Sequence, residues 1–322
     1  MRKLYPDIEP YRSWYLTRGG HRIHVEEAGN PEGMPVLFLH GGPGSGCKPC
    51  QRRFFDPARY RIILFDQRGA GQSTPQGRLD GNTTAELIGD MEALRLSLAI
   101  ERWLLFGGSW GAALALLYAE AHARRVSGLV LRGTFLARAS DLAWFASETG
   151  APRLYPEVWE QLLRILPQAT RHRPLTALHG LLNGPDELAR RRAARAWEHW
   201  SSQVVLGEGF SAGSLEEEPA SLAILHQARI ELHYAVNHYF IAENAILEGA
   251  DRLAGLPMHI IHGTRDFVCP VEAAYRLHWR LPEARLQVLP GAGHIAAGDD
   301  MIDALVQAAD DMLAGADWKV AR

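Results

Sequence analysis

One stretch decides the fold of this 322-residue chain: Leu104-Leu105-Phe106-Gly107-Gly108-Ser109-Trp110-Gly111-Ala112-Ala113-Leu114. The apolar run before the glycines is typical of a buried strand, and the Ala- and Leu-rich run after them is typical of a helix. Between the two lies G-x-S-x-G, which in a strand–turn–helix context predicts a nucleophile elbow. Glycines are needed because a serine on so sharp a turn is strained and neighbouring backbone passes very close. We therefore expect the Ser109 hydroxyl at a helix N-terminus, where free N–H groups favour developing negative charge.

Short strands and helices alternate on both sides of this stretch. We expect buried strands at residues 36–39, 61–65, 103–106, 127–131, 258–261 and 286–289, and helices at 84–98, 112–123, 271–281 and 301–313. Residues 14–28 alternate in polarity and turn at Gly19-Gly20, which predicts a β-hairpin at a sheet edge. Strands that alternate with helices predict an α/β fold, with a mostly parallel sheet covered by helices on both faces.

The pattern changes in the middle of the chain. Aromatic residues there lie in stretches with helical spacing, and no strand candidate is convincing. A run of apolar residues at steps of three and four indicates one amphipathic helix, at Leu225, Ala228, Leu232, Ala235 and Tyr239. We therefore expect an all-helical insertion at residues 136–253, set into an α/β core formed by residues 1–135 and 254–322.

Composition restricts the possible partners and the location. A formal net charge of −3, with 22% charged residues, gives no reason to expect nucleic acid or an anionic membrane as a partner. No stretch approaches the roughly 20 apolar residues of a membrane helix, and residues 1–9 are too polar for a signal peptide. We therefore expect a cytoplasmic protein. Cys47 and Cys50 form a C-x-x-C without a second pair, which favours reduced thiols over a zinc site.

Three candidate catalytic residues follow directly on predicted strands, at the sheet edge where ligands of open α/β sheets bind. Their order, Ser109, Asp266, His294, is the order typical of an α/β-hydrolase. A serine hydroxyl is a weak nucleophile without an adjacent base, and His294 would supply that base. Asp266 would hold the imidazole in the right tautomer and stabilise its charged form. Three other acids compete for the last role: Asp299, Asp300 and Asp303.

An oxyanion site is also expected at this edge. The negative oxygen of a tetrahedral intermediate needs preorganised N–H donors. The best candidates are the backbone N–H groups of Trp110 and of a glycine in His40-Gly41-Gly42, of which Gly42 fits best. The chain contains neither H-E-x-x-H nor G-x-G-x-x-G, so we expect neither a metal nor a dinucleotide cofactor.

The chain resembles the proline iminopeptidases, also called prolyl aminopeptidases, of the α/β-hydrolase superfamily. The resemblance covers nearly the whole chain and rests on several motifs: His40-Gly41-Gly42-Pro43-Gly44, Asp66-Gln67-Arg68-Gly69-Ala70-Gly71-Gln72-Ser73-Thr74-Pro75, Asn82-Thr83-Thr84, Gly107-Gly108-Ser109-Trp110-Gly111, Leu131-Arg132-Gly133, Ala228-Arg229-Ile230-Glu231 and Gly293-His294. It implies an α/β-hydrolase fold with a helical cap over the active site, and release of an N-terminal proline from small peptides without a cofactor.

The resemblance also implies how the substrate amine is recognised. Enzymes of this family use two cap glutamates, and the first matches Glu231. The second follows the last tryptophan of a W-x-x-W stretch, and here Ser201 holds that position. Glu198 lies three residues earlier, one helical turn away, and is a candidate to compensate. Without the resemblance, the sequence pattern alone favours a solvated carboxylate at Glu231, beside the apolar face of its helix.

These observations leave two catalytic hypotheses and one of another class. The leading hypothesis is a serine aminopeptidase of the proline iminopeptidase type, and Glu231 favours it. The alternative is an esterase or amidase on the same scaffold whose substrate lacks a free amine, and Ser201 favours that. A non-catalytic binding module would require loss of Ser109, Asp266 or His294, and all three are present.

Overall fold

One sheet of eight strands forms the centre of the computed structural model, which describes residues 1–210 and 220–315. Its strands lie in the order β1-β2-β4-β3-β5-β6-β7-β8. The hairpin strands β1 and β2 add antiparallel pairs at one edge, and the remaining pairs are parallel. The strands are β1 Arg12–Arg18, β2 His21–Gly29, β3 Met34–Leu39, β4 Tyr60–Phe65, β5 Trp103–Ser109, β6 Val126–Thr134, β7 Met258–Gly263 and β8 Arg285–Leu289.

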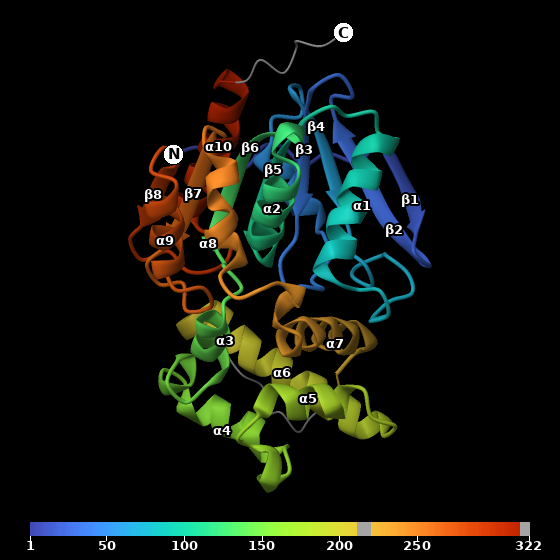
Figure 1. The fold of residues 1–322 in the computed structure, drawn as a ribbon, viewed down its shortest axis with the longest axis vertical. Helices are drawn as coiled ribbons and strands as arrows, with labels where there is room; N and C mark the ends of the chain where they lie inside the picture. Colours follow the sequence, from blue (N-terminus) through green and yellow to red (C-terminus); the bar gives the residue numbers. More distant parts are fainter. Residues whose placement is uncertain (211–219, 316–322) are drawn as a thin grey trace.

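Helices cover both faces of this sheet. One face carries α1 (Thr84–Ser97), α2 (Trp110–Ala121), α8 (Ala245–Gly249) and α9 (Glu272–Arg280), which lie in front of the sheet in Figure 1. The other face carries α10 (Asp299–Gly315) and the short helix η1 (Pro49–Phe54). The fold class predicted from the sequence is confirmed.

Alternation along the strands explains the two layers. In β5, Leu105 belongs to the core on the α2 side, whereas Leu104 and Phe106 belong to the core on the α10 side. Successive side chains of a strand point to opposite faces, so one short apolar run contributes to both cores. The buried run before the elbow therefore fixes β5 in the middle of the sheet.

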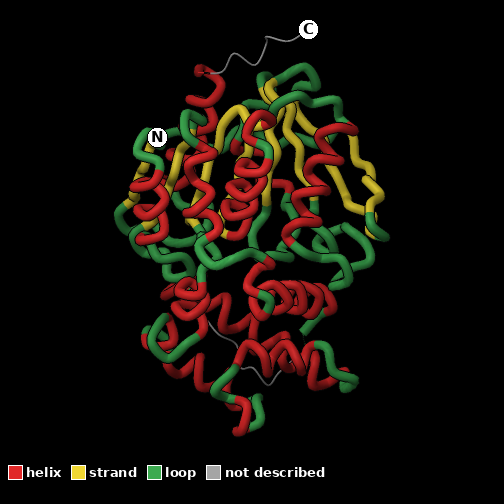
Figure 2. The backbone as a smooth tube through the Cα atoms, viewed as in Figure 1, coloured by secondary structure: helices red, strands yellow, loops and turns green. Residues whose placement is uncertain are grey.

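A group of helices lies beyond the strand ends, between β6 and β7 in the sequence (Figures 1 and 2). Its helices are α3 Ala139–Ala146, α4 Pro156–Arg164, α5 Pro174–Leu182, α6 Glu187–Leu206 and α7 Leu222–Val236. They share an apolar core of their own, to which Trp159, Trp197 and Trp200 contribute. No strand occurs among the described residues from 136 to 253, as the sequence predicts.

The exact limits of this helical part stay a prediction. Ile246 of α8 and Leu253 are buried in the core beside α2, although both precede the predicted boundary at residue 253/254. Residues 211–219 of the predicted insertion and 316–322 of the predicted core lie outside the described residues.

Helix α7 belongs to both parts of the molecule. Its Ile230 and Tyr234 are buried in the core beneath the elbow, while Ala228 and Leu232 are buried in the helical core. The hydroxyl of Tyr234 donates to Oδ1 of Asn82, which precedes α1, at 2.9 Å. The helix thus packs against the sheet part as well as against its neighbouring helices.

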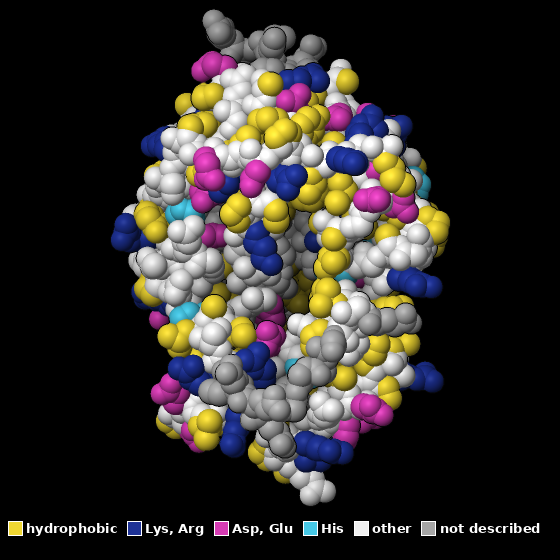
Figure 3. Space-filling view, turned by 180° about the vertical axis from the view of Figure 1, so that it is seen from behind, with side chains coloured by type: hydrophobic (Ala, Val, Ile, Leu, Met, Phe, Trp, Pro, Cys, Tyr) yellow, Lys and Arg dark blue, Asp and Glu magenta, His cyan; other side chains and the backbone are white. Residues whose placement is uncertain are grey.

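The surface is hollowed between the sheet part and the helical part when the molecule is seen from behind (Figure 3). None of the helices among the described residues is long and apolar enough to cross a membrane.

Candidate active site

Ser109 lies on a strained turn between β5 and α2. Its φ of 58° and ψ of −125° place a non-glycine residue in a sparsely populated region. A Cβ atom on Gly111 would overlap the carbonyl of Leu39, and one on Gly107 would overlap the carbonyl of Gly111. Glycine is therefore required at both positions of G-x-S-x-G, because the helix, the turn and the end of β3 lie too close together to leave room for a methyl group.

Asp266 and His294 form a hydrogen-bonded pair after β7 and β8. Nδ1 of His294 lies 2.8 Å from Oδ2 and 2.9 Å from Oδ1 of Asp266. Both side chains are buried. A carboxylate only accepts hydrogen bonds, so Nδ1 carries the proton and Nε2 keeps its lone pair. This is the tautomer that can act as a base toward a hydroxyl.

The surroundings of Asp266 favour its charged form. Burial by itself raises the pKa of Asp266, but attraction to His294 and hydrogen bonding outweigh burial, and the net pKa is lowered. The backbone N–H groups of Val268 and Cys269 donate to Oδ1 at 3.0 and 2.9 Å. The carboxylate therefore stays ionised and can stabilise an imidazolium beside it.

The competing acids lie elsewhere. Asp299 and Asp300 occupy the first turn of α10, and Asp303 accepts a hydrogen bond from the backbone N–H of Arg2. Among the described residues, none of the three is hydrogen-bonded to His294. Asp266 is the acid that the fold brings to this histidine.

Cys269 was not predicted from the sequence, yet it lies beside the nucleophile. Its Sγ is 4.0 Å from Oγ of Ser109, and within the described chain no hydrogen bond joins Ser109 to His294. Catalytic hydrogen bonds are often long before substrate binds. The sequence offered one indication of this position of Cys269: it follows the predicted catalytic Asp266 by three residues.

The same cysteine completes the group of side chains best placed to share a metal ion in the described chain: Asp266, Cys269 and His294, with ligand atoms within 4.8 Å of one another. Two of these groups are already hydrogen-bonded to each other. Burial raises the pKa of the Cys269 thiol well above its usual value, which disfavours the thiolate that metals bind. The donor set therefore fits a hydrogen-bonded pair better than a metal centre.

Three loops are tied together on the other side of Ser109. Gln67, after β4, accepts from Nε1 of Trp110 at 2.9 Å and donates through its side-chain amide to the carbonyl of His40 at 2.9 Å. Its backbone N–H donates to Nε2 of His40 at 3.0 Å. Burial lowers the pKa of His40, so the ring is neutral and Nδ1 carries the proton. This network links the loop after β3 to the first residue of α2.

That network also orients the candidate oxyanion donor. Nδ1 of His40 donates to the carbonyl of Gly41 at 2.9 Å. In a trans peptide the N–H points opposite to the carbonyl, so the Gly42 N–H points away from the imidazole. A Cβ atom on Gly41 would lie 3.4 Å from Cβ of Ser109, so this loop runs directly beside the elbow.

Glu231 on α7 is a partly buried carboxylate with neutral partners. Its Oε2 accepts from Nε1 of Trp197 at 2.6 Å, and its Oε1 accepts from Nε2 of Gln227 at 2.8 Å. Within residues 1–210 and 220–315 it forms no ion pair. Burial raises the pKa of Glu231, and the two hydrogen bonds only partly oppose that rise. Its neighbour Ile230 packs against Gly44, so this part of α7 borders the loop after β3.

The other two predicted binding residues lie on α6. Glu198 accepts from Nη1 of Arg195 at 2.7 Å, and its side chain is 36% exposed. Ser201 is partly buried and follows Trp197 by one helical turn. Residues four apart share a helix face, so Ser201, rather than Glu198, lies on the face that carries the indole bound to Glu231.

The comparisons with known proteins agree with this arrangement. A family model described as the α/β hydrolase fold matches residues 34–300. A hydrolase of that fold family from Bacillus anthracis has a similar structure, with a TM-score of 0.60 at 17% identity, covering 94% of this chain and 100% of the other. The class of protein is thus an α/β-hydrolase.

Curated relatives narrow the class. A proline iminopeptidase from Xylella fastidiosa is 46% identical over 318 residues, covering 97% of this chain and all of the relative. One from Xanthomonas citri is 46% identical over 315 residues, covering 96% and 99%. The chain therefore belongs to the proline iminopeptidase family.

Proposed function

We propose that this protein is a serine aminopeptidase that releases an N-terminal residue, preferentially proline, from small peptides. The observation that carries the proposal is Glu231, a partly buried carboxylate beside the loop after β3 that is held by two neutral donors. A protonated substrate amine is the cation that such a site lacks. The curated relatives named above are proline iminopeptidases, which supports the same substrate.

The proposed chemistry starts at Ser109. Nε2 of His294 takes the proton from the hydroxyl as Oγ attacks the scissile carbonyl carbon. The oxygen of the tetrahedral intermediate accepts hydrogen bonds from the N–H groups of Gly42 and Trp110, and the N-terminus of α2 adds to this stabilisation. His294 then passes its proton to the leaving amine, and the C–N bond breaks to leave an acyl-enzyme. Water attacks the ester by the reverse use of the same groups.

Recognition of the amine is proposed for Glu231. A carboxylate offers about four acceptor positions, and protein donors occupy two of them here. A charge-assisted hydrogen bond in a buried site is roughly twice as strong as a neutral one. Ser201 contributes no charge, and Glu198 is already paired with Arg195. The proposed amine site therefore depends on one carboxylate, and the role of Glu198 stays a prediction.

The second candidate function is that of an esterase or amidase acting on substrates without a free amine. Ser201, in place of a second carboxylate, is the observation that favours it. A site with one carboxylate of raised pKa discriminates less strongly for a cation than a site with two. Under both candidates the protein works on small molecules, and the cytoplasmic location expected from the sequence stays a prediction.

The two candidates are separated by a ratio of rates. We would measure kcat/KM for a proline anilide and for a simple ester on the wild type, Glu231→Gln, Ser201→Glu and the control Glu198→Gln. Glu231→Gln should lower the anilide value by about 10- to 150-fold, because a charged hydrogen bond is worth roughly 1.5–3 kcal/mol. The ester value should barely change. An unchanged ratio would favour the esterase.

The remaining two variants test whether the proposed amine site lacks a second carboxylate or already has one in Glu198. Ser201→Glu should raise selectivity for the anilide if one carboxylate is missing from the site. Glu198→Gln should leave the ratio unchanged if its charge is used by Arg195. A fall in the ratio for Glu198→Gln comparable to that for Glu231→Gln would assign Glu198 to the amine site instead.

A further inference from the structure

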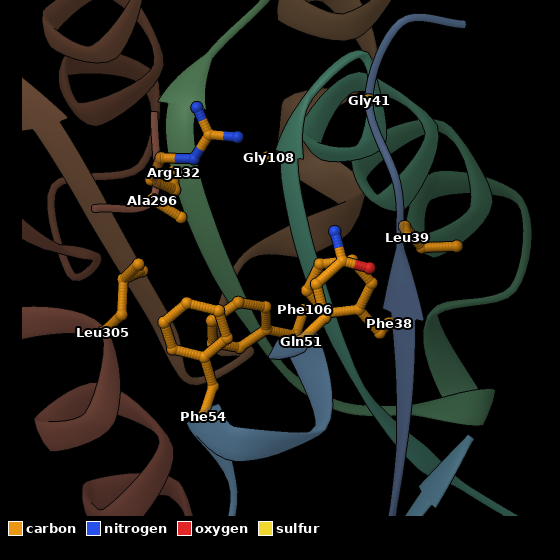
Figure 4. Close-up of a pocket in the computed structure, with 10 residues that line it drawn as sticks. All are labelled: Phe38, Leu39, Gly41, Gln51, Phe54, Phe106, Gly108, Arg132, Ala296 and Leu305. Atoms are coloured by element: carbon orange, nitrogen blue, oxygen red, sulfur yellow. The ribbon is translucent and has the colours of Figure 1, made fainter. Parts of the chain in front are cut away.

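Arg132 lies on β6 beside the nucleophile elbow and takes no part in the steps above. Its guanidinium group lies next to Gly108 at one end of a cavity of about 70 Å³ (Figure 4). The apolar side chains on the cavity wall are those of Phe38, Leu39, Phe54, Phe106, Ala296 and Leu305, and Gln51 lines it as well. A cationic side chain is thus held against the sheet, on the side of α10.

No carboxylate among the described residues forms an ion pair with Arg132. Burial lowers the pKa of this guanidinium, and the charge of Asp266 opposes part of that change. An arginine stays charged under such conditions. Arg132 is partly buried, and withdrawing a charge from water without an ion-pair partner costs free energy, so hydrogen bonds of the guanidinium group are needed to offset that cost.

The guanidinium makes one contact that bears on catalysis: Nη1 donates to the backbone carbonyl of His294. Elsewhere in the loop between β8 and α10, the described hydrogen bonds lie at its two ends: the N–H of Gly291 donates to Thr264 and the carbonyl of Ala292 accepts from Arg265, each at 2.9 Å, and the carbonyl of Gly298 accepts from Ile302 at 3.0 Å. For residues 293–297, the hydrogen bonds within the described chain are those from Arg132 and to Asp266, both at His294.

We infer that Arg132 is a positioning residue for His294. It holds the backbone of the histidine while Asp266 holds the imidazole, and the two contacts together direct Nε2 toward Ser109. This inference rests on the proposed role of His294 as the base. A displacement of a catalytic group by about 1 Å can cost on the order of a hundredfold in rate.

Gly108 supports the assignment. It occupies the variable position before the serine in G-x-S-x-G, which the motif leaves open. A Cβ atom at this position would overlap Nη2 of Arg132. Glycine at 108 therefore leaves the space in which the guanidinium reaches the carbonyl of His294.

The first test separates turnover from binding. Arg132→Met should lower kcat for a proline anilide by about 10- to 100-fold, with KM nearly unchanged. Arg132→Lys should lie between it and the wild type, because an ammonium keeps the charge but not the planar fork of donors. The control is Arg102→Met, since Arg102 also donates to a backbone carbonyl, that of Val126, at the opposite end of the same strands. The control should leave kcat unchanged.

The second test is chemical rescue. Millimolar guanidinium should enter the enlarged cavity of Arg132→Ala and restore part of kcat with saturation. Urea at the same concentration should not, and neither agent should restore Ser109→Ala. A residue with a purely structural role would instead lower Tm in proportion to lost activity and show no rescue.

The outcomes are distinguishable. A kcat for folded Arg132→Met within about threefold of wild type overturns the inference, while an inactive Ser109→Ala leaves the proposed function standing. If Ser109→Ala keeps its activity, the proposed function fails instead. Should Arg132→Met not fold, Arg132→Lys decides in the same way: kcat near the wild-type value overturns the inference, and a selective loss of kcat supports it.

Discussion

Two carboxylates, the buried Asp266 at the strand ends and the partly buried Glu231 on α7, are surrounded in opposite ways. Asp266 faces His294 and two backbone N–H groups, and its pKa is lowered. Glu231 faces an indole and an amide, and its pKa is raised. The difference is that Asp266 has a partner within the protein that can carry a positive charge, whereas Glu231 has no cationic partner among the described residues. The proposed chemistry belongs to the strand-end region around Asp266 and the proposed substrate selection to the region of Glu231 on α7.

Removing the nucleophile of the strand-end region should cause the largest loss of activity. We expect Ser109→Ala to lower kcat/KM by about ten-thousandfold to a millionfold, since only the oxyanion donors and binding remain. The fold and Tm should be retained, because the side chain is only partly buried. The measurement is anilide and ester turnover on protein shown to be folded. Turnover within about tenfold of wild type would mean that the reaction does not use Ser109.

Removing the charge of the first carboxylate should rank second. Asp266→Asn should cost roughly four decades in kcat, because an amide favours the wrong imidazole tautomer. Anilide and ester should lose activity equally, since both need the base. Asp299→Asn and Asp303→Asn are matched controls, as neither acid is hydrogen-bonded to His294 in the described chain. A larger loss in either control would contradict the assignment of Asp266.

The raised pKa of Glu231 predicts a pH dependence specific to amine substrates. The substrate ammonium binds the ionised form of Glu231. As pH falls through the raised pKa of Glu231, the carboxylate becomes protonated and no longer binds the ammonium. The anilide-to-ester ratio of kcat/KM should therefore fall on acidification, beginning at a higher pH than an ordinary glutamate would give. Taking the ratio removes the titration of groups that both substrates share. The decline should vanish in Glu231→Gln, and a flat ratio in the wild type would count against amine binding by this residue.

The smallest expected effect concerns stability, at a partly buried carboxylate outside the site, that of Glu120. Burial raises the pKa of Glu120 on α2 to about 8, from the usual 4.5 of a glutamate. Between those two pH values the unfolded chain ionises this group while the folded chain keeps it protonated, so stability falls as pH rises through this window. Glu120→Gln should therefore raise Tm by about 2–4 °C at pH 8 and less near pH 5.

The exposed Glu101 supplies the control for that prediction. Glu101→Gln should not change the pH dependence of Tm. If Glu120→Gln gives the same Tm difference from wild type at both pH values, the carboxyl of Glu120 is not protonated in the folded state.

The fold was predictable because its signals are local. Short apolar runs, strand-to-helix alternation and the elbow glycines need no knowledge of distant contacts. The end of β5 was predicted at Phe106, but the strand continues to Ser109 because Gly107, Gly108 and Ser109 pair with residues of β6. That extension depends on a neighbouring strand and has no local signal.

The candidate site was predictable only in part. The positions of Ser109, Asp266 and His294 after successive strands could be read from the sequence, and their catalytic roles stay predictions. The partner of Glu231 could not be read, because Trp197 lies 34 residues away on another helix. The contact of Arg132 with His294 spans 162 residues and has no sequence pattern at all. Such contacts arise from packing between elements and not from the composition of any one of them.

The position of helix α7 bears on how many residues the proposed enzyme would remove from the N-terminus of a peptide. Ile230 and Tyr234 fix the helix to the sheet part, and Glu231 lies between them in the sequence. The packing of α7 against the sheet thus determines where Glu231 lies relative to Ser109. Under the proposed roles, Glu231 binds the charged N-terminus of a peptide and Ser109 attacks the first peptide bond, so one residue lies between the two sites. Trimming by single residues would then follow from geometry, whatever sequence lies downstream of the cut.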